Sequence, residues 1–219
     1  MNKAEREILL RDKLVQMKHY ENDLHARGIA YVAGIDEVGR GPLAGPVCAA
    51  AVVLPADFDI LGIDDSKKLS EKKRETLYAL ITEHALAWGI GLVDNERIDK
   101  INILNATKEA MLAALTEAKK MLRTHVAEAP GIGHILVDAV KLPEAGIPGT
   151  AIIKGDQKSV SIAAASIVAK VTRDRMMVRL DTVYPGYAFA SNKGYGTKAH
   201  YEGIANLGLT PIHRRTFVR

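Results

Sequence analysis

Short apolar runs in the first half of the chain predict three β-strands. The segments IAYVAGID (29–36), PVCAAAVVLP (46–55) and AWGIGLV (87–93) have strand-like lengths and lie between glycine, proline or polar residues. The run from Val47 to Leu54 is the longest apolar stretch, so we expect it to be a buried strand. The three segments can form successive hairpins.

Helical spacing of apolar residues predicts two helices around these strands. Residues from about 3 to 26 combine a few apolar positions with many charges, which suits one amphipathic helix that ends near Gly28. A polar loop, DDSKKLS (64–70), then leads into a second helix with Ser70 as its N-cap. We expect the following residues on one face of that helix: Leu77, Leu80, Ile81 and Leu86.

Helices and strands alternate in the second half. Asn105 is the candidate N-cap of a helix with apolar residues at helical spacing, which are Met111, Leu115, Ala118 and Leu122. HILVDAV (134–140) and GTAIIKGD (149–156) are further strands, each with an aspartate at its end. Residues 159–184 are alanine-rich and lack glycine and proline, so they predict a helix packed closely on the core. This order predicts an α/β domain with a mixed β-sheet flanked by helices.

Composition and charge extend this picture. The chain has 219 residues, of which 47% are hydrophobic and 26% charged, as in soluble globular proteins. No run reaches the roughly 18 apolar residues of a membrane span, and the charged N-terminus has no signal-peptide pattern, so we expect a cytoplasmic location and no membrane contact. Cys48 is the only cysteine and lies in an apolar run, so a buried structural thiol is expected.

The positive charge is concentrated at the C-terminus. The net charge is +4, and the residues from 191 onward carry all of it, because five basic residues there oppose Glu202 alone. A solvated basic tail is one interpretation, and a lobe that meets a polyanion such as nucleic acid is the other. A short helix is expected around residues 198–206, in a small helical C-terminal portion.

Four acids share one context, at or just past the end of a predicted strand. Asp36 and Glu37 close the first strand, Asp138 closes HILVD, and Asp156 follows AIIKG. We expect Asp36 to point into a site and Glu37 to reach it from the turn after the strand. Adjacent strand ends in α/β sheets form ligand sites, and clustered carboxylates need cations. Oxygen ligands favour Mg²⁺ or Mn²⁺, and two such ions about 3.5–4 Å apart serve phosphodiester hydrolysis. Each acid could instead cap a turn, and Asp156 could cap the next helix.

Other segments could contact a nucleic acid. Gly39 and Gly41 flank Arg40, so the backbone can approach a ligand such as a ribose 2′-hydroxyl closely, although a plain turn is an equal interpretation. Lys67 and Lys68 in DDSKKLS could meet phosphates, or belong to an ordinary charged loop. YPGYAFASNKGYGTKAH (184–200) suits stacking on sugars or bases, or a folded surface loop.

Several motifs together resemble the bacterial ribonuclease HII family. They are GIDEVGRGPLAGPV, DSKKLS, INILNATKEAM, LVDA, KGDQKSVSIAAASIVAKVTRDR and NKGYGTKAHYEGI, in this order between Tyr31 and Phe217. The resemblance implies a ribonuclease H-like fold and an Mg²⁺- or Mn²⁺-dependent enzyme. Such an enzyme hydrolyses the RNA strand of RNA–DNA hybrids and nicks duplex DNA 5′ of single ribonucleotides, leaving a 5′-phosphate and a 3′-hydroxyl.

The resemblance also implies roles for individual residues. Asp36, Glu37, Asp138 and Asp156 would form the catalytic metal-binding quartet. Gly39, Arg40 and Gly41 would contact the 2′-hydroxyl, and Tyr195 would stack at the RNA–DNA junction. Asp174 is about 27 Å of helix beyond Asp156. We therefore expect it to form a structural ion pair with its neighbour Arg173 or Arg175.

The expected organisation is a single main domain with appendages. Residues 1–30 would be an N-terminal helical extension, 31–190 the ribonuclease H-like catalytic domain, and 191–219 a basic substrate-binding portion of that domain. The partners would be RNA–DNA hybrids and ribonucleotide-containing duplex DNA, with a monomeric protein and no assigned protein partner. Ribonuclease HIII is the nearest alternative, but its N-terminal substrate-binding domain does not fit in the 35 residues before Asp36. A non-catalytic nucleic-acid-binding domain and a small-molecule phosphohydrolase are further alternatives.

Overall fold

A mixed β-sheet forms the centre of the molecule. The computed structural model describes residues 2–218. Met1, in the expected N-terminal extension, and Arg219, in the expected C-terminal portion, lie outside the described residues. The sheet has five strands in the order β3-β2-β1-β4-β5. They are β1 (Val32–Val38), β2 (Val47–Val53), β3 (Ala87–Val93), β4 (His134–Asp138) and β5 (Gly149–Ile152). β1, β2 and β3 pair antiparallel, whereas β4 pairs parallel with both β1 and β5.

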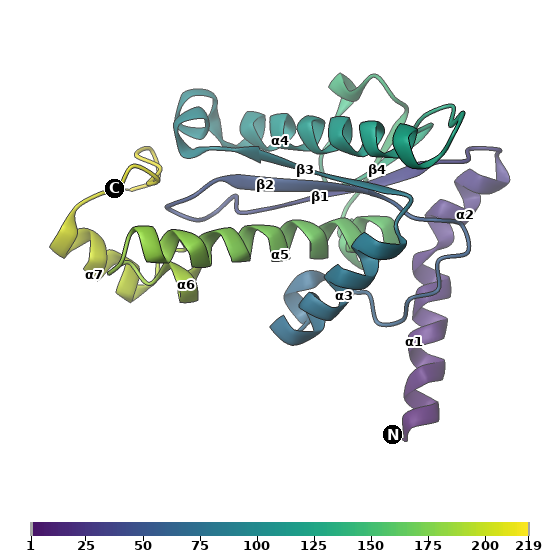
Figure 1. The fold of residues 1–219 in the computed structure, drawn as a ribbon, viewed down its shortest axis with the longest axis horizontal. Helices are drawn as coiled ribbons and strands as arrows, with labels where there is room; N and C mark the ends of the chain where they lie inside the picture. Colours follow the sequence, from purple (N-terminus) through teal and green to yellow (C-terminus); the bar gives the residue numbers. More distant parts are fainter. Residues whose placement is uncertain (1, 219) are drawn as a thin grey trace.

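Helices cover both faces of the sheet (Figure 1). α4 (Asn95–His125) lies on one face, and α5 (Val160–Val183) lies on the other with α3 (Glu71–His84) beside it. The expectation of an α/β domain with a mixed sheet flanked by helices is therefore confirmed. The N-terminal helices and the C-terminal portion lie at opposite ends of the sheet (Figure 1).

Alternating side chains of β2 fill the two cores. Val47, Ala49 and Ala51 pack in the core under α4, whereas Cys48, Ala50 and Val52 pack in the core under α5. Both sets are small or β-branched, so the strand is buried on both faces, as its continuous apolar run predicted. The thiol of Cys48 is fully buried, and burial raises its pKa to about 12, which confirms an inert structural cysteine.

α5 approaches β1 closely at its N-terminal end. A Cβ atom at Gly34 would overlap the backbone of Ser161, in the first turn of α5. Only glycine therefore allows this packing. The contact places the start of α5 against Gly34, which lies two residues before Asp36 in β1.

The N-terminal segment differs from the single helix expected for residues 3–26. It forms α1 (Lys3–Met17) and α2 (His19–Ala26), with Lys18 between them. The ammonium of Lys18 donates to the carbonyl oxygens of Ala56 at 2.7 Å and Phe58 at 3.0 Å. The helix is thus interrupted at Lys18, whose side chain is hydrogen-bonded to the loop after β2.

The expected N-cap at Asn105 is wrong. α4 begins at Asn95 with Asp94 as its N-cap, and it is kinked at Asn102, where φ is 66°. The side chain of Asn102 accepts hydrogen bonds from the N–H groups of Leu104 and Asn105. Asn102 therefore caps the second part of the helix, three residues before the expected position.

Leu86 is not on the apolar face of α3. That helix ends at His84, and it buries Leu77 and Ile81 with Ser70 as N-cap. Leu86 follows the helix and packs against the core on the α4 side of the sheet. The N-cap and the two buried positions were predicted correctly, but the helix is shorter than expected.

The C-terminal portion is helical, as expected. It contains α6 (Phe189–Asn192) and α7 (Lys198–Leu207), and Thr197 caps α7. Short 3₁₀ helices lie in the connections between larger elements: η1 (Ser66–Lys68), η2 (Pro143–Ala145) and η3 (Gly155–Gln157).

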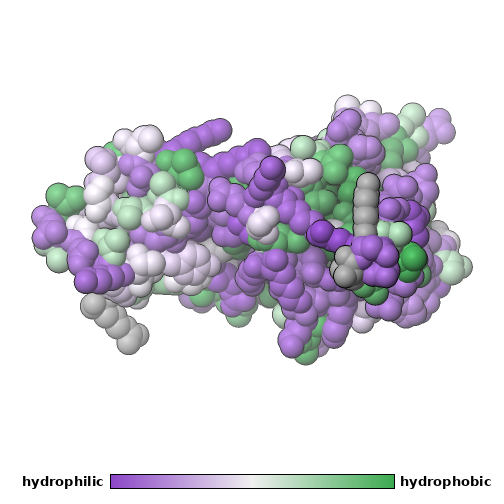
Figure 2. Space-filling model, turned by 90° about the horizontal axis from the view of Figure 1, so that it is seen from below, coloured by the Kyte–Doolittle hydropathy of each residue, from purple (hydrophilic) through white to green (hydrophobic). Residues whose placement is uncertain are grey.

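One face of the molecule is largely polar. Seen from the side of α3 and α5, it is mostly hydrophilic, with apolar side chains in small separate areas (Figure 2). Among residues 2–218, no helix has the length and apolar character needed to cross a membrane.

Candidate active site

The two adjacent acids both lie within β1. The strand extends to Val38, so Glu37 is not in a turn beyond the strand end, as the sequence had suggested. Asp36 pairs in register with Ala50 and Glu37 with Ala49. These alanines belong to the cores on opposite faces of the sheet, so the two carboxylates leave β1 on opposite sides.

Asp138 comes next to Asp36 through the parallel pairing of β1 and β4. Ile35 pairs with Val137, which places the following residue of each strand side by side. Oδ1 of Asp138 accepts a hydrogen bond of 2.7 Å from the N–H of Gly155. This bond draws the loop that carries Asp156 towards the end of β4.

Backbone strain accompanies these acids. Ala139, directly after Asp138, has φ of 51°, and Lys154, two residues before Asp156, has φ of 57°. Non-glycine residues in this left-handed region cost about 1–3 kcal/mol each, and such residues cluster at functional sites. The two strained residues lie near Asp138 and Asp156, in the connections that turn these aspartates towards the end of the sheet.

Asp156 does not cap the helix that follows it. It lies in η3 and is 8% exposed, and Ser159 is the N-cap of α5, accepting a bond from the N–H of Ile162. The capping interpretation of Asp156 is therefore wrong. Burial, and then the charges of Asp65 and Asp138, raises the pKa of Asp156 to about 6.

Asp65 is a further carboxylate that sequence reasoning missed. It is 7% exposed, accepts a bond of 2.9 Å from the N–H of Lys67, and approaches the amide of Gln157 at 3.4 Å. Its charge acts on Asp156, so the two carboxyl groups are neighbours. The signal was present in DDSKKLS, where an aspartate directly precedes the lysines.

The site has an excess of negative charge. Burial, followed by the charges of Glu37 and Asp138, raises the pKa of Asp36 well above its usual value. Burial also raises the pKa of Glu37, although Arg40, whose guanidinium lies 3.6 Å from its carboxylate, opposes the shift. Oε2 of Glu37 is buried without a hydrogen-bond partner in the described part of the chain.

These features fit a cation site built from oxygen ligands. Repelling carboxylates and an unpartnered carboxylate oxygen would both be relieved by a divalent ion. Within residues 2–218, however, no three His, Cys, Asp or Glu side chains are already grouped as a metal-binding set. The two-ion site therefore stays a prediction.

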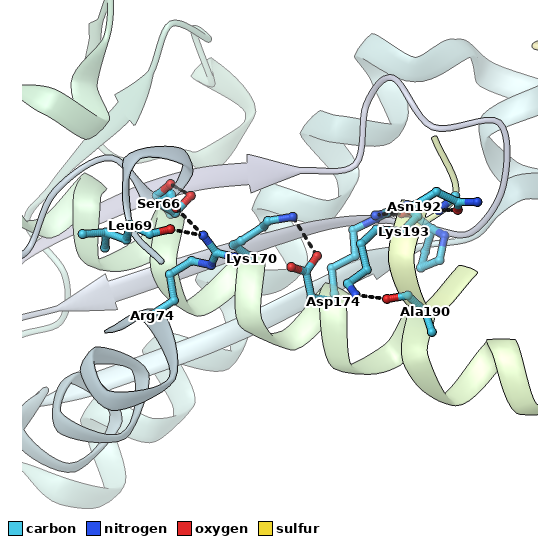
Figure 3. Close-up of polar contacts among 12 residues, drawn as sticks. Ser66, Leu69, Arg74, Lys170, Asp174, Ala190, Asn192 and Lys193 are labelled. Carbon is cyan, nitrogen blue, oxygen red and sulfur yellow. Dashed lines mark hydrogen bonds and ion pairs between the residues drawn. The ribbon is translucent and has the colours of Figure 1, made fainter. Parts of the chain in front are cut away.

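Hydrogen bonds from α5 and from α3 hold the DSKKLS loop. The hydroxyls of Ser66 and Ser166 are hydrogen-bonded at 2.8 Å, and the Ser166 hydroxyl also lowers the pKa of Asp36 through a hydrogen bond. Arg74 of α3 donates to the carbonyl oxygens of Ser66 and Leu69 (Figure 3). These contacts fix the backbone around the two lysines.

The two lysines of the loop face different groups. The charge of Lys67 acts on Glu37 and Asp156, whereas that of Lys68 acts on Asp64. The structure therefore brings Lys67 to the acids, and places Lys68 on the outer side of the loop. Both side chains are exposed.

The glycine-flanked arginine lies against the loop that carries Tyr195. Gly39 has φ of 90° and packs on the side chain of Arg173, while Arg40 and Gly41 are exposed. A Cβ atom at Gly41 would lie 3.6 Å from Cε1 of Tyr195, and Tyr195 itself is 43% exposed. The structure thus brings these two expected substrate-binding segments together.

Asp174 forms an ion pair, but not with either neighbouring arginine. Its carboxylate accepts a bond of 2.8 Å from Lys170, one turn earlier on α5 (Figure 3). Arg173 points into the core, and Arg175 pairs with Glu75 on α3. The structural role expected for Asp174 is confirmed, with a different partner.

Comparisons with known proteins show the family and the fold of the chain. A protein of Listeria innocua named Ribonuclease HII is 53% identical over 215 residues, which cover 98% of this chain and 78% of the relative. The crystal structure of ribonuclease H2 from Pyrococcus horikoshii has a TM-score of 0.66 at 29% identity, covering 85% of this chain and 93% of that one.

A more distant structure has the same fold. It is Bst ribonuclease HIII, solved in complex with Mn²⁺, with a TM-score of 0.59 at 21% identity. It covers 83% of this chain and 71% of that chain. The sequence profile of the family described as Ribonuclease HII matches residues 33–219. The chain thus belongs to the ribonuclease HII family of endoribonucleases.

Proposed function

We propose that this endoribonuclease is metal-dependent, hydrolyses the RNA strand of RNA–DNA hybrids and nicks duplex DNA on the 5′ side of single embedded ribonucleotides. The products would carry a 5′-phosphate and a 3′-hydroxyl. The observation that carries the proposal is the gathering of buried and half-buried carboxylates at the ends of β1 and β4. Asp36 and Asp138 meet there, and Glu37 and Asp156 interact electrostatically with Asp138.

The four acids would hold Mg²⁺ or Mn²⁺ ions. Two ions bound there would activate a water and stabilise the leaving oxygen. The Mn²⁺ in the Bst ribonuclease HIII structure supports a divalent cation in this fold. The protein supplies no nucleophile in this scheme. Its carboxylates orient the site, and Lys67, whose charge reaches Glu37 and Asp156, would neutralise the phosphate.

Selection of the ribonucleotide would depend on the segment from Gly39 to Gly41. Its glycines leave the backbone open to close approach, so that N–H or C=O groups can meet a 2′-hydroxyl. Tyr195, exposed beside Gly41, would stack at the junction with the next deoxynucleotide. Arg40 and Lys68 would contribute charge to phosphate binding.

The cellular role that follows is removal of ribonucleotides from DNA during replication and repair. The substrates are RNA–DNA hybrids and ribonucleotide-containing duplex DNA. We propose that the protein acts as a monomer in the cytoplasm.

A single assay tests the proposal. A labelled DNA duplex with one embedded ribonucleotide is incubated with the protein and Mn²⁺ or Mg²⁺, and then with EDTA. We expect a nick 5′ of the ribonucleotide that EDTA abolishes, and a loss of at least about 100-fold in Asp36→Asn and Asp138→Asn. The exposed Asp59 provides the matched control, since Asp59→Asn should retain wild-type activity. Undiminished cutting by the two active-site variants, or cutting without metal, would refute the proposal.

A further inference from the structure

Two arginines are fully buried beside the segment from Gly39 to Gly41, which is proposed to contact the ribonucleotide. Arg173 on α5 and Arg214 near the C-terminus have no exposed surface. A buried charge must be compensated by hydrogen bonds or an opposite charge. Both guanidinium groups donate to backbone carbonyl oxygens, and nearly all of these belong to residues 39–46.

Arg214 joins the two ends of the turn after β1. It donates to the carbonyl oxygens of Gly39 at 2.6 Å, Arg40 at 2.9 Å and Gly45 at 3.0 Å. The planar guanidinium presents its donors in a fixed fork, so three bonds to three carbonyls fix the orientation of these groups as well as their distance.

Arg173 connects the same turn to the loop that carries Tyr195. It donates to the carbonyl oxygens of Ala44 at 3.2 Å, Pro46 at 2.9 Å and Lys193 at 2.9 Å. The N–H of Leu43 also donates to the carbonyl of Gly194 at 2.8 Å. The spacing between the turn and the loop therefore depends on this arginine together with the bond between Leu43 and Gly194.

The orientation of the carbonyls determines where the neighbouring N–H groups point. A peptide unit is planar and trans, so its C=O and N–H point in opposite directions. When Arg214 draws the carbonyls of Gly39 and Arg40 inward, the N–H groups of Arg40 and Gly41 are directed outward. Both residues are exposed, and within residues 2–218 neither N–H group donates a hydrogen bond.

We propose that Arg214 and Arg173 are positioning residues for ribose recognition. Arg214 holds two outward N–H groups where a 2′-oxygen can accept from them, and Arg173 sets the distance from these groups to Tyr195. This inference rests on the proposed function, because it assumes that residues 39–41 meet the ribonucleotide. It gives the C-terminal segment a role in substrate selection without direct contact with the substrate.

The test separates recognition from folding. KM and kcat are measured on the single-ribonucleotide duplex, and an all-DNA duplex of the same sequence is used as a competitor to obtain its Ki. For Arg214→Lys, which keeps the charge but loses the fork, we expect the ratio of Ki to KM to fall about tenfold, with Ki unchanged. A purely structural role would lower the active fraction and leave both constants as in the wild type.

Two other variants complete the design. Arg123→Lys, at an exposed position on α4, is the matched control and should retain the wild-type ratio. Asp99 accepts from the N–H of Arg215 at 2.8 Å, so Asp99→Ala loosens the segment next to Arg214 from the surface and should lower the ratio two- to threefold. If Arg214→Lys does not fold, the ratio of Ki to KM measured for Asp99→Ala tests the inference in its place.

The possible outcomes distinguish a failure of this inference from a failure of the proposed function. A wild-type ratio in every folded variant, including Asp99→Ala, would overturn this inference while the proposed function stands. Wild-type protein that does not nick the ribonucleotide duplex would overturn the proposed function, and this inference with it.

Discussion

At the scale of single residues, Asp65 adds a carboxylate to a site that is already rich in negative charge. Its side chain accepts a hydrogen bond from the N–H of Lys67 and lies against Asp156, whose pKa it helps to raise. Such a residue can tune a cation site without binding the ion directly, because it orients the first ligands and sets the local charge.

Replacing Asp65 should therefore change the metal dependence of the enzyme. We expect Asp65→Asn to need about tenfold more Mn²⁺ for half-maximal nicking, since partners of metal ligands typically contribute about 10–100-fold to metal affinity or activity. A Mn²⁺ titration of initial rates measures this. Asp64→Asn is the neighbouring control, because Asp64 pairs with Lys13 at 2.5 Å. Identical titration curves for Asp65→Asn and the wild type would contradict the prediction.

The two glycines around Arg40 should respond differently to alanine. Gly39 has φ of 90°, and its Cβ would overlap the side chain of Arg173, so Gly39→Ala should lower the melting temperature clearly. At Gly41 the new methyl group meets only Tyr195, at 3.6 Å. We expect Gly41→Ala to melt like the wild type but to lose about tenfold in kcat/KM on the single-ribonucleotide duplex.

Thermal melting and nicking rates measured on the same preparations distinguish the two effects. Arg40→Ala serves as the comparison, and it should cost less activity than Gly41→Ala because the argument concerns backbone access. A larger loss for Arg40→Ala would show that the guanidinium, not the backbone, makes the important contact.

At the scale of elements, the sequence predicted what local pattern determines. The continuous apolar run of β2 and the alanine-rich α5 were recognised because burial on all sides leaves a local signature. The break at Lys18 and the kink at Asn102 were missed, since Lys18 is held by the distant residues Ala56 and Phe58, and the Asn102 turn lies inside an otherwise helical pattern.

The same distinction between local patterns and contacts with distant residues applies to the candidate site. The four acids stood out because each lies at or just past the end of a predicted strand, and the pairing of β1 with β4 brings Asp36 beside Asp138. Asp65 and Arg214 did not stand out. A charged residue in a polar segment is usually solvated, and only the folded structure shows these two buried against Asp156 and the turn at Gly39.

The N-terminal extension is joined to the start of α5 by one buried acid. Oε1 of Glu21 on α2 accepts bonds from the hydroxyls of Ser159, at 2.5 Å, and Ser161, at 2.6 Å, and from the N–H of Ser161 at 3.1 Å. The carboxylate also lies at a helix N-terminus, where negative charge is favourable. The extension therefore stabilises the helix that follows Asp156.

Removing this charge should weaken the fold. We expect Glu21→Gln to lower the free energy of unfolding by about 1–3 kcal/mol, the usual range for a buried charged acceptor of hydrogen bonds. Urea denaturation followed by circular dichroism gives the value. Glu7→Gln is the control, because Glu7 forms an exposed pair with Arg11 at 3.6 Å, and such pairs contribute about 0–1 kcal/mol. Equal midpoints for the two variants would refute the assigned role.

At the scale of the whole molecule, two buried histidines join separate segments of the C-terminal portion to one another. Nδ1 of His213 accepts from the N–H of Thr210 at 2.9 Å, so its Nε2–H can donate to Nε2 of His200 at 3.0 Å. Nδ1–H of His200 then donates to the carbonyl of Tyr195 at 2.9 Å. This chain of hydrogen bonds requires both imidazoles to be neutral.

Acid should therefore open this end of the molecule first. Burial, and then the neighbouring His200, lowers the pKa of His213 from 6.5 to about 4, so the unfolded chain binds more protons than the folded chain between these values. The histidine contribution is intact above pH 6.5 and is lost progressively as the pH falls towards 4. We expect the melting temperature to fall over this interval less steeply in His213→Gln than in the wild type. His84→Gln, at an exposed position on α3, should follow the wild-type curve. Parallel curves for the wild type and His213→Gln would show that another group governs acid stability.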